Sequence, residues 1–421
     1  MLQRRTVILG AVGTAAGLTA AGCSHAGTAD GANGATTPLA GGEWHSPGDG
    51  DGGGESPAAA AITLNVSPAA GKADVSPLDP VLVSVEGGTL QSVTVAAGGK
   101  KVGGKVQSDG SWKSSGTMAY SKTYTVTASI KDSTGATVQK TSTFTTLKPK
   151  SIANITFQAN GLNALKAGGT YGVGQPVIVA FSKSVSDKAA AEKAIEVETT
   201  PSVSGKFHWV SNSIVHWRPE KYWAKGTEIK VTVNGLGTHL GKGVYASSNR
   251  STTFTIGRSL IAICDNNTHR CKVYIDGKMV RDMACSNGRG GYTKIANGQQ
   301  IHFWTQNGPH VVLSKEMVHS MSSASYGLTD KNNPYYYDPE DVKFCTRITY
   351  SGEFLHAAPW NHKLGKANIS HGCVNLGEAD AEWVYHNFLI GDVVQVNNSP
   401  KPLPLTDGLG DWTVSYEKYG N

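Results

Sequence analysis

The sequence is poor in charge. Only 17% of its 421 residues are Asp, Glu, Lys or Arg, and the formal net charge is +6. No run of Lys and Arg interleaved with aromatic residues occurs, so the sequence does not indicate a nucleic-acid partner. A mildly basic balance suits a protein that rests beside an anionic cell wall or membrane surface. The length predicts two to four domains rather than one.

A hydrophobic run long enough to span a membrane comfortably is also missing near the N-terminus. The uncharged apolar stretch Val7–Ala21 is short and follows Arg4 and Arg5. This order of a charged region and a short apolar region predicts a secretory signal. The arginine pair also resembles a twin-arginine export signal. The protein is therefore expected to be exported, by one route or the other.

The apolar stretch leads into small residues before Cys23, which resembles a bacterial lipobox, although Ala20 stands where Leu is usual. We expect a signal peptide with lipobox over residues 1–23, lipidation of Cys23 and anchoring at the outer face of the cytoplasmic membrane. An ordinary signal with an incidental Cys is the alternative. Residues 24–60 have almost no large apolar side chains and predict a flexible linker.

The fold is expected to be mainly β. Short strands that alternate apolar and polar residues, separated by Gly and Pro, predict two tandem immunoglobulin-like β-sandwiches at residues 61–148 and 149–257. The closing strands of the two modules echo each other in sequence. Three tryptophans of the second module are expected to pack in its core rather than stack on a sugar; they are Trp209, Trp217 and Trp223.

Residues 258–397 predict a third, β-rich domain with a single convincing helix, and residues 398–421 predict a small C-terminal extension that folds back onto that domain. The helix is expected where Ala379, Trp383 and Phe388 mark an apolar stripe with acidic residues near its start.

The six cysteines have different expected roles. A four-residue turn between Cys264 and Cys271 would place them opposite each other on paired strands, within disulfide reach. Cys285 and Cys345 are a weaker candidate for a second bridge. With Cys23 lipidated, Cys373 is left as the free thiol.

The residues that indicate chemistry are His356 and Cys373. A thiol nucleophile needs a neighbour that takes or holds its proton, and imidazole is the usual one. Gly372 before the cysteine allows close backbone approach to a substrate. The N–H groups of Gly372 and Cys373 are expected to point at a developing oxyanion.

The order of these residues excludes other exported cysteine enzymes. Papain-like and NlpC/P60-type peptidases place Cys before His, whereas His356 precedes Cys373 here. Sortases need a later Arg, and no Arg follows Cys373. A zinc site at His356, His371 and Cys373 is not favoured, since the spacing is not that of structural zinc. An inert, merely packed Cys373 is not favoured either. No metal or cofactor is expected.

These residues resemble a known family. The stretch Ser370-His371-Gly372-Cys373-Val374-Asn375, with sixteen residues between His356 and the cysteine, is similar to the signature of the L,D-transpeptidases with a YkuD-type catalytic domain. Tyr350–Trp360 resembles the strand and turn that lead into the catalytic His. Met321–Gly327 resembles the lid of the family's immunoglobulin-bearing branch, whose domain order, including the lipobox and C-terminal extension, matches nearly the whole chain.

The resemblance implies a cysteine acyltransferase. Cys373 would attack the carbonyl of the third residue of a peptidoglycan tetrapeptide stem, release D-Ala and form a thioester. An amine of a neighbouring stem would resolve it into a 3→3 cross-link, with His356 as base and then acid. The backbone carbonyl that orients the catalytic His would come from Ala357, where the branch often has Ser. Inhibition by carbapenems is also expected.

The resemblance further implies the substrate-binding residues. His371 and Asn375 would shape the pocket, and Tyr336 is chosen from three consecutive tyrosines as the one that faces it. The remaining predicted contacts are Met321, Tyr326, Tyr350, Ser351, Gly352, Trp360 and Ser370.

Two other functions remain open at the level of sequence. An L,D-carboxypeptidase would use the same residues to trim stems by hydrolysis. A non-catalytic wall-binding lipoprotein would use the β-modules and keep the third domain as a relic, against which the intact motif argues.

Overall fold

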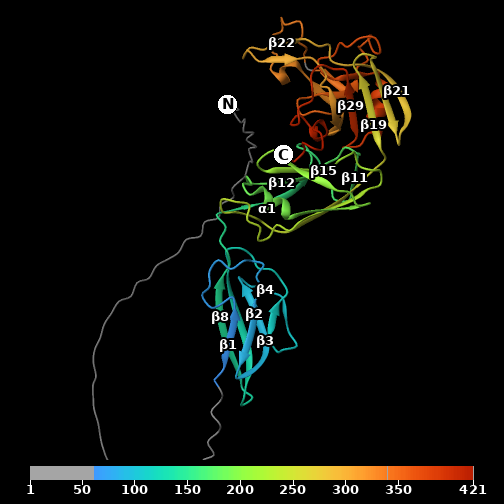
Figure 1. Cartoon of the computed structure of the whole chain (residues 1–421). Helices are drawn as coiled ribbons and strands as arrows, with labels where there is room; N and C mark the ends of the chain where they lie inside the picture. Colours follow the sequence, from blue (N-terminus) through green and yellow to red (C-terminus); the bar gives the residue numbers. More distant parts are fainter. Residues whose placement is uncertain (1–60, 339, 421) are drawn as a thin grey trace, which may run out of the picture. The chain divides into compact units, whose positions relative to one another are not determined.

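The computed structural model describes residues 61–338 and 340–420. The predicted signal peptide, the lipidation site Cys23 and the linker lie outside the described residues. Within the described part, no helix combines the length and apolar character needed to cross a membrane. The chain is mainly β, with strands through most of its length, as Figure 1 shows.

The first sandwich has two four-stranded sheets, in the orders β1-β2-β6-β5 and β4-β3-β7-β8. Alternating apolar residues such as Val126 and Ile130 bury one face of β7, and Trp112 and Phe144 fill the space between the sheets. The strands are β1 (Thr63–Ser67), β2 (Leu82–Glu86), β3 (Gly88–Ala97), β4 (Lys100–Val102), β5 (Gly104–Val106), β6 (Trp112–Ser114), β7 (Thr123–Asp132) and β8 (Thr137–Thr145).

The second sandwich also pairs two four-stranded sheets, in the orders β10-β12-β15-β14 and β11-β18-β16-β13. A two-stranded parallel sheet joins β9 to β17. The strands are β9 (Ser151–Ala153), β10 (Ile155–Gln158), β11 (Gly169–Tyr171), β12 (Val177–Phe181), β13 (Ile195–Thr200), β14 (Gly205–Trp209), β15 (Ile214–Pro219), β16 (Glu228–Val233), β17 (Val244–Ala246) and β18 (Arg250–Ile256).

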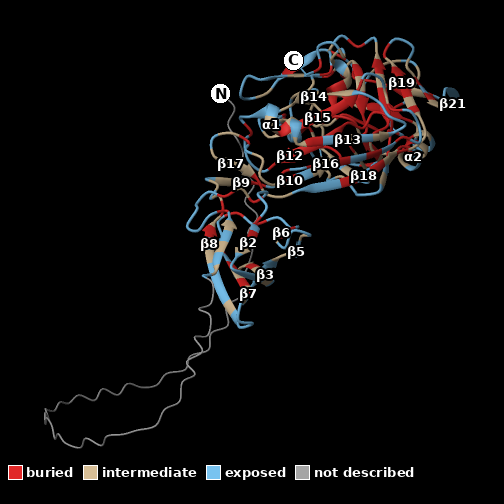
Figure 2. Ribbon diagram, turned by 60° about the horizontal axis from the view of Figure 1, so that its bottom comes forward, coloured by how far each residue is buried: buried red, intermediate tan, exposed pale blue. Residues whose placement is uncertain are grey.

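The core of the second sandwich lies on β12 and β15, whose residues are almost all buried (Figure 2). Trp217 and Trp223 stack there with ring centroids 5.7 Å apart, and the Trp223 indole donates to the Gln175 carbonyl. Trp209 is half-buried against Phe181. These contacts agree with core packing of the tryptophans.

A short helix in this module was not expected from the sequence. Helix α1 (Lys188–Lys193) has only six residues and buries one of them, Ala191. The Asp187 side chain caps its first turn by accepting a hydrogen bond from the Ala190 N–H. Because such a helix has no apolar stripe, periodicity gave no signal for it.

The third domain is built on one curled nine-stranded sheet, in the order β24-β29-β19-β20-β21-β28-β27-β26-β25. Its strands are β19 (Leu260–Asp265), β20 (Arg270–Ile275), β21 (Lys278–Ser286), β24 (Gly308–Val311), β25 (Ser314–Met321), β26 (Glu340–Arg347), β27 (Phe354–Ala357), β28 (Val374–Leu376) and β29 (Val393–Asn397). A separate hairpin joins β22 (Tyr292–Lys294) to β23 (Gln300–His302).

Helix α2 (Glu378–Asn387) follows β28, where the apolar stripe predicted it. It buries Ala381 and Val384 in the same cluster as Leu355 and Ala357 of β27. Successive strand residues point to opposite faces, so His356 between them faces away from this core. The helix therefore covers one face of β27 and leaves the other face to the site.

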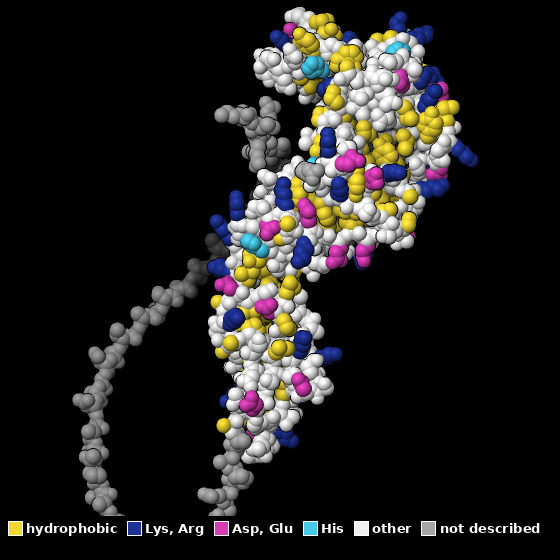
Figure 3. All heavy atoms as spheres, in the orientation of Figure 1, with side chains coloured by type: hydrophobic (Ala, Val, Ile, Leu, Met, Phe, Trp, Pro, Cys, Tyr) yellow, Lys and Arg dark blue, Asp and Glu magenta, His cyan; other side chains and the backbone are white. Residues whose placement is uncertain are grey.

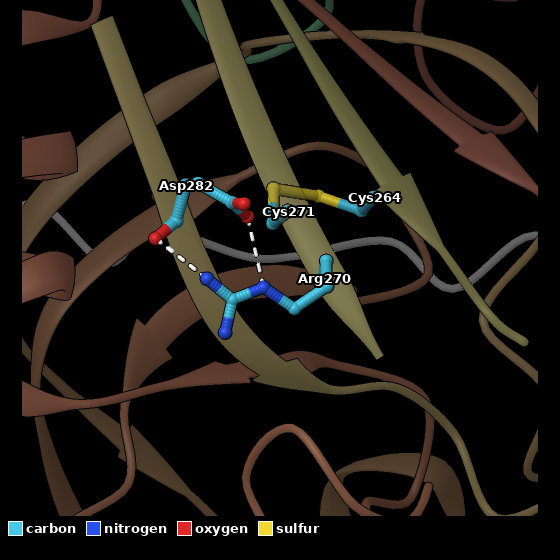
Figure 4. Close-up of a disulfide and its surroundings, with 4 residues drawn as sticks. All are labelled: Cys264, Arg270, Cys271 and Asp282. Atoms are coloured by element: carbon cyan, nitrogen blue, oxygen red, sulfur yellow. Dashed lines mark hydrogen bonds and ion pairs between the residues drawn. A yellow bond between two sulfur atoms is a disulfide. The ribbon is translucent and has the colours of Figure 1, made fainter. Parts of the chain in front are cut away.

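The expected disulfide joins Cys264 of β19 to Cys271 of β20, which lie opposite each other in the register (Figure 4). Beside it, Arg270 donates to Asp282 of β21 at 2.8 Å. The suggested second bridge is wrong. Cys345 lies in β26 and Cys285 in β21, with β28 and β27 between them, and both thiols are free and buried.

The C-terminal segment, residues 398–420, does more than fold back onto the third domain. Its start runs beside Asn307 of that domain through a parallel bridge at Pro402. Its end docks on the second sandwich, where the Trp412 indole donates to the Gly174 carbonyl and the buried Arg218 donates to the Val414 carbonyl. The expected docking on the third domain was therefore incomplete. Three aromatic rings of the segment also cover the buried guanidinium of Arg218 in the second sandwich; they are Trp412, Tyr416 and Tyr419.

On the face seen in Figure 3, Lys and Arg side chains are interspersed with Asp and Glu rather than gathered in one patch. Dispersed charges of both signs cancel at distances beyond a Debye length. This face therefore offers no basic footprint of the kind that holds a polyanion.

Candidate active site

The site is built on two parallel strands inside the nine-stranded sheet. Strands β27 and β28 pair in parallel, with His356 opposite Asn375. Cys373 immediately precedes β28, and it lines the same pocket as His356 and Asn375. Residues that are separate in the sequence thereby converge on one surface.

His356 is fixed by its own strand. It is buried, and its Nδ1 lies 2.8 Å from the carbonyl oxygen of Ala357. That carbonyl accepts the Nδ1 proton, so the other ring nitrogen, Nε2, carries the lone pair. Burial lowers the pKa of His356 to about 4. The imidazole is therefore neutral at physiological pH and available as a base.

Cys373 is partly exposed at the site, and its Sγ donates to the Gly352 carbonyl at 3.7 Å. Desolvation raises the pKa of this thiol to about 12. We expected pairing with His to lower it, but the hydrogen-bond partner of the thiol is the Gly352 carbonyl, and burial dominates the shift. The thiol and the imidazole are thus both neutral at rest.

One of the two predicted oxyanion donors, the Gly372 N–H, already has a hydrogen-bond partner. The Gly372 N–H donates to Ser370 Oγ at 3.1 Å, and that hydroxyl donates to the Cys373 carbonyl at 2.6 Å. Gly372 has a φ of 138°, in the region that favours glycine. The predicted pair of oxyanion donors is therefore incomplete at rest, because Gly372 already has a partner.

Two pockets meet at Cys373. The first has a cavity volume of about 560 Å³ and the second about 230 Å³. Four residues line both of them: Met321, Tyr337, His371 and Cys373. His356 lines only the second pocket. A group held in either pocket can reach the thiol.

Nearly all of the predicted binding residues line these pockets. Tyr326, at the end of the 3₁₀ helix Ser323–Tyr326, lines the first pocket together with Tyr350, Ser351, Gly352 and Gly372. Trp360, Ser370 and Asn375 line the second. The Trp360 ring lies beside His356, with centroids 6.3 Å apart.

Tyr336 is the exception. Its hydroxyl donates to Asp338 at 2.6 Å and it lines neither pocket. The neighbouring Tyr337 lines both and packs against His371 with ring centroids 5.2 Å apart. Consecutive residues in an extended segment point in opposite directions. Tyr336 and Tyr337 therefore lie on opposite sides of the chain, and Tyr337 is the one that faces the pockets.

Sequence reasoning missed several pocket residues. Arg289 and Glu340 bring opposite charges to the second pocket. Gln306 and Glu353 lie at the floor of the first, where burial raises the pKa of Glu353 and the Gln306 N–H donates to it at 3.0 Å. Glu353 lies within the Tyr350–Trp360 stretch that resembles the family, whereas Arg289, Gln306 and Glu340 belong to no motif.

Within residues 61–338 and 340–420, no group of three or more His, Cys, Asp or Glu side chains is placed to hold a metal ion. His371 stands instead in an aromatic setting, with the Phe303 ring at right angles to it. Burial lowers the pKa of His371 to about 4, and Arg289 adds to the effect.

Two family models match the chain. Residues 72–239 match the model described as a bacterial Ig domain, and residues 259–396 match that of the L,D-transpeptidase catalytic domain. The second match contains His356 and the Ser370–Asn375 motif with Cys373.

Two curated proteins of Mycobacterium tuberculosis are similar over most of their length. L,D-transpeptidase 2 of strain CDC 1551 / Oshkosh is 37% identical over 344 residues, which are 81% of this chain and 79% of that protein. L,D-transpeptidase 5 of strain ATCC 25618 / H37Rv is 32% identical, over 85% of this chain and 76% of that protein. Among solved structures, that of LD transpeptidase LdtMt1 in complex with imipenem covers 57% of this chain and 98% of its own, at 28% identity and a TM-score of 0.46.

The lowered pKa of His356 gives a pH prediction. The imidazole accepts the thiol proton only when neutral, so the rate of Cys373 acylation by a carbapenem should stay level as pH falls from 8 to about 5.5. It should then drop with an apparent pKa of about 4, where His356 becomes protonated. Stopped-flow measurement across this range, with intrinsic fluorescence to verify folding, checks the profile. An acid limb centred near the ordinary His value of about 6.5 would contradict it.

The adjacent tyrosines form a matched pair of variants. Tyr337 lines both pockets, and burial keeps its hydroxyl protonated by raising its pKa. Tyr337→Phe should slow acylation by roughly tenfold to a hundredfold, if the phenol stabilises developing charge. Tyr336→Phe, which removes an exposed contact to Asp338, should stay within about twofold of the native rate. Equal effects of the two variants would sink this assignment.

Proposed function

This chain belongs to the L,D-transpeptidase family, and we propose that it forms 3→3 cross-links between peptidoglycan stem peptides through a thioester on Cys373. The observation that carries the proposal is the meeting of two separate pockets at one thiol, with a neutral imidazole on the same face. Transfer of an acyl group requires places for a donor and an acceptor at one nucleophile. Hydrolysis requires a binding pocket for the acyl donor only, because water takes the part of the acceptor.

In the first half-reaction, Sγ of Cys373 attacks the carbonyl of the third stem residue while His356 takes the thiol proton. The tetrahedral adduct collapses when His356 returns that proton to the leaving amine of D-Ala. A thioester remains. This concerted route suits a thiol whose pKa is raised and an imidazole whose pKa is lowered, because no stable ion pair forms at rest.

In the second half-reaction, the amine of a neighbouring stem attacks the thioester. His356 takes a proton from that amine and delivers it to the sulfur as the amide forms, which regenerates the thiol. The Cys373 N–H and the Tyr337 hydroxyl are the proposed donors to the oxyanion in both steps. Gly372 N–H joins them only if its bond to Ser370 opens.

The incubation that tests the function uses a disaccharide-tetrapeptide as the sole substrate. We expect a dimer whose mass equals two substrates less one D-Ala, with fragmentation placing the new amide between two third residues. Cys373→Ala should abolish the product. A mass equal to the tripeptide alone would replace transfer by hydrolysis, and no change of mass would leave the wall-binding alternative standing.

A carbapenem provides the control for the nucleophile, because its strained carbonyl acylates a reactive thiol. Intact-protein mass spectrometry should show one adduct on the native chain and none on Cys373→Ala. Cys345→Ala is the matched variant, since this second thiol is free but buried and lines neither pocket. It should keep the adduct.

We further propose that the protein acts outside the cytoplasmic membrane, held by lipid on Cys23. The support is the signal-like N-terminus and a substrate that lies in the cell wall. Detergent extraction of cell membranes should recover the mature chain with a lipid-bearing Cys23 as its first residue. The variant Cys23→Ala should leave the membrane fraction, whereas Cys373→Ala should remain there; equal partitioning of both would contradict anchoring at Cys23.

A further inference from the structure

The turn between β26 and β27 holds the nucleophile. Gly352 in this turn offers the carbonyl to which the Cys373 thiol donates. The neighbouring Ser351 and Tyr350 line the first pocket with it. A shift of the turn would therefore move the Cys373 sulfur and change the shape of the first pocket.

The turn has only modest support from its own hairpin. The Thr349 hydroxyl lies 3.1 Å from Ser351 Oγ and accepts from the Glu353 N–H at 2.8 Å. The Ile348 N–H donates to the Glu353 carbonyl at 2.9 Å. None of these bonds reaches Gly352, which has a positive φ of 107° and no Cβ to pack.

A carboxylate from the C-terminal segment supplies the missing support. Asp407 Oδ1 accepts from the Ser351 N–H at 2.7 Å, and Oδ2 accepts from the Ser351 hydroxyl at 2.6 Å. Oδ2 also accepts from Gln306 Nε2 at 2.6 Å. Both donor residues line the first pocket, whereas Asp407 does not and stands behind them.

Asp407 is itself held on both sides. Before it, the Leu403 N–H donates to the Asn307 carbonyl at 2.9 Å. After it, Leu409 packs with Val311 and Leu313 of the third domain. A little further on, buried Asp411 accepts from the His216 ring at 2.8 Å on the second sandwich. The carboxylate is thus presented by a segment that is anchored rather than loose.

We propose that Asp407 is a positioning residue for the reaction: its carboxylate fixes the Ser351–Gly352 turn so that the Gly352 carbonyl holds the Cys373 thiol in line for attack. Hydrogen bonds to an ionised acceptor are shorter and stronger than neutral ones, and three of them converge here. The inference rests on the proposed function, since it assigns Asp407 a part in the acylation of Cys373.

The direct test is Asp407→Asn in the full chain, with carbapenem acylation followed by stopped flow. An amide keeps the volume but replaces one acceptor oxygen by a donor that faces Ser351 and Gln306. The maximal acylation rate should fall by roughly tenfold to a hundredfold, while the half-saturating carbapenem concentration moves by less than about threefold. Rates are normalised to the final adduct yield in the mass spectrum, so misfolded molecules do not count.

A matched control separates positioning from stability. Asp276 also bonds one backbone N–H and one side chain, those of Ser259 at 3.1 Å and Lys225 at 2.7 Å, and lines neither pocket. Asp276→Asn should leave the maximal acylation rate within about twofold, whatever it does to the melting temperature. A loss of rate in both variants would reduce Asp407 to a structural role and overturn the proposal.

Ser351→Ala completes the design. Ser351→Ala removes only the hydroxyl contact and keeps the Ser351 N–H bond to Asp407. If Asp407 acts through Ser351, the double variant should be little slower than Asp407→Asn alone, because the hydroxyl contact is already disrupted there. Additive losses would overturn the proposed route. Acylation is measured separately from cross-linking, so an absent cross-link refutes the proposed function, whereas Asp407→Asn acylating at the native rate refutes this inference.

Discussion

The parallel pairing of β27 with β28 is the constraint on which the rest of the site depends. One register places His356 against Asn375, and Cys373, just before β28, lines the same pocket as both. A slip by one residue would turn His356 into the apolar cluster that contains Leu355, Ala357 and the buried side of α2. Packing of α2 on the opposite face therefore fixes the chemistry as well as the fold.

The Cys373 thiol and the His356 imidazole are both kept neutral by desolvation. Desolvation disfavours both the thiolate and the imidazolium, and it moves the two pKa values apart, to about 12 for Cys373 and about 4 for His356. A resting thiol is protected from adventitious reaction, since thiolate is the reactive form. Reactivity then depends on geometry, which explains why a turn that holds the sulfur matters.

That turn is held by parts of the chain outside its own sheet. The C-terminal segment reaches it through Asp407, and the second sandwich reaches it through the Gly161 N–H, which donates to the Tyr350 hydroxyl at 2.7 Å. The same segment is clamped on that sandwich by Trp412 and the buried Arg218. The accessory module and the C-terminal segment thus share in shaping the first pocket, through hydrogen bonds to two adjacent residues.

The sequence by itself determined the family, the mainly β fold and the Cys264–Cys271 bridge, and it singled out Cys373 and His356 as the proposed nucleophile and base, because each rests on local spacing or on one short motif. Strand alternation also predicted the two sandwiches, although it missed the short helix α1 of the second one. Only the tertiary structure decided that Tyr337 and not Tyr336 faces the pockets, that Cys285 and Cys345 stay apart, and that Asp407 supports the turn. These depend on side-chain direction and on contacts between distant segments, and no pattern within a short stretch of sequence contains either.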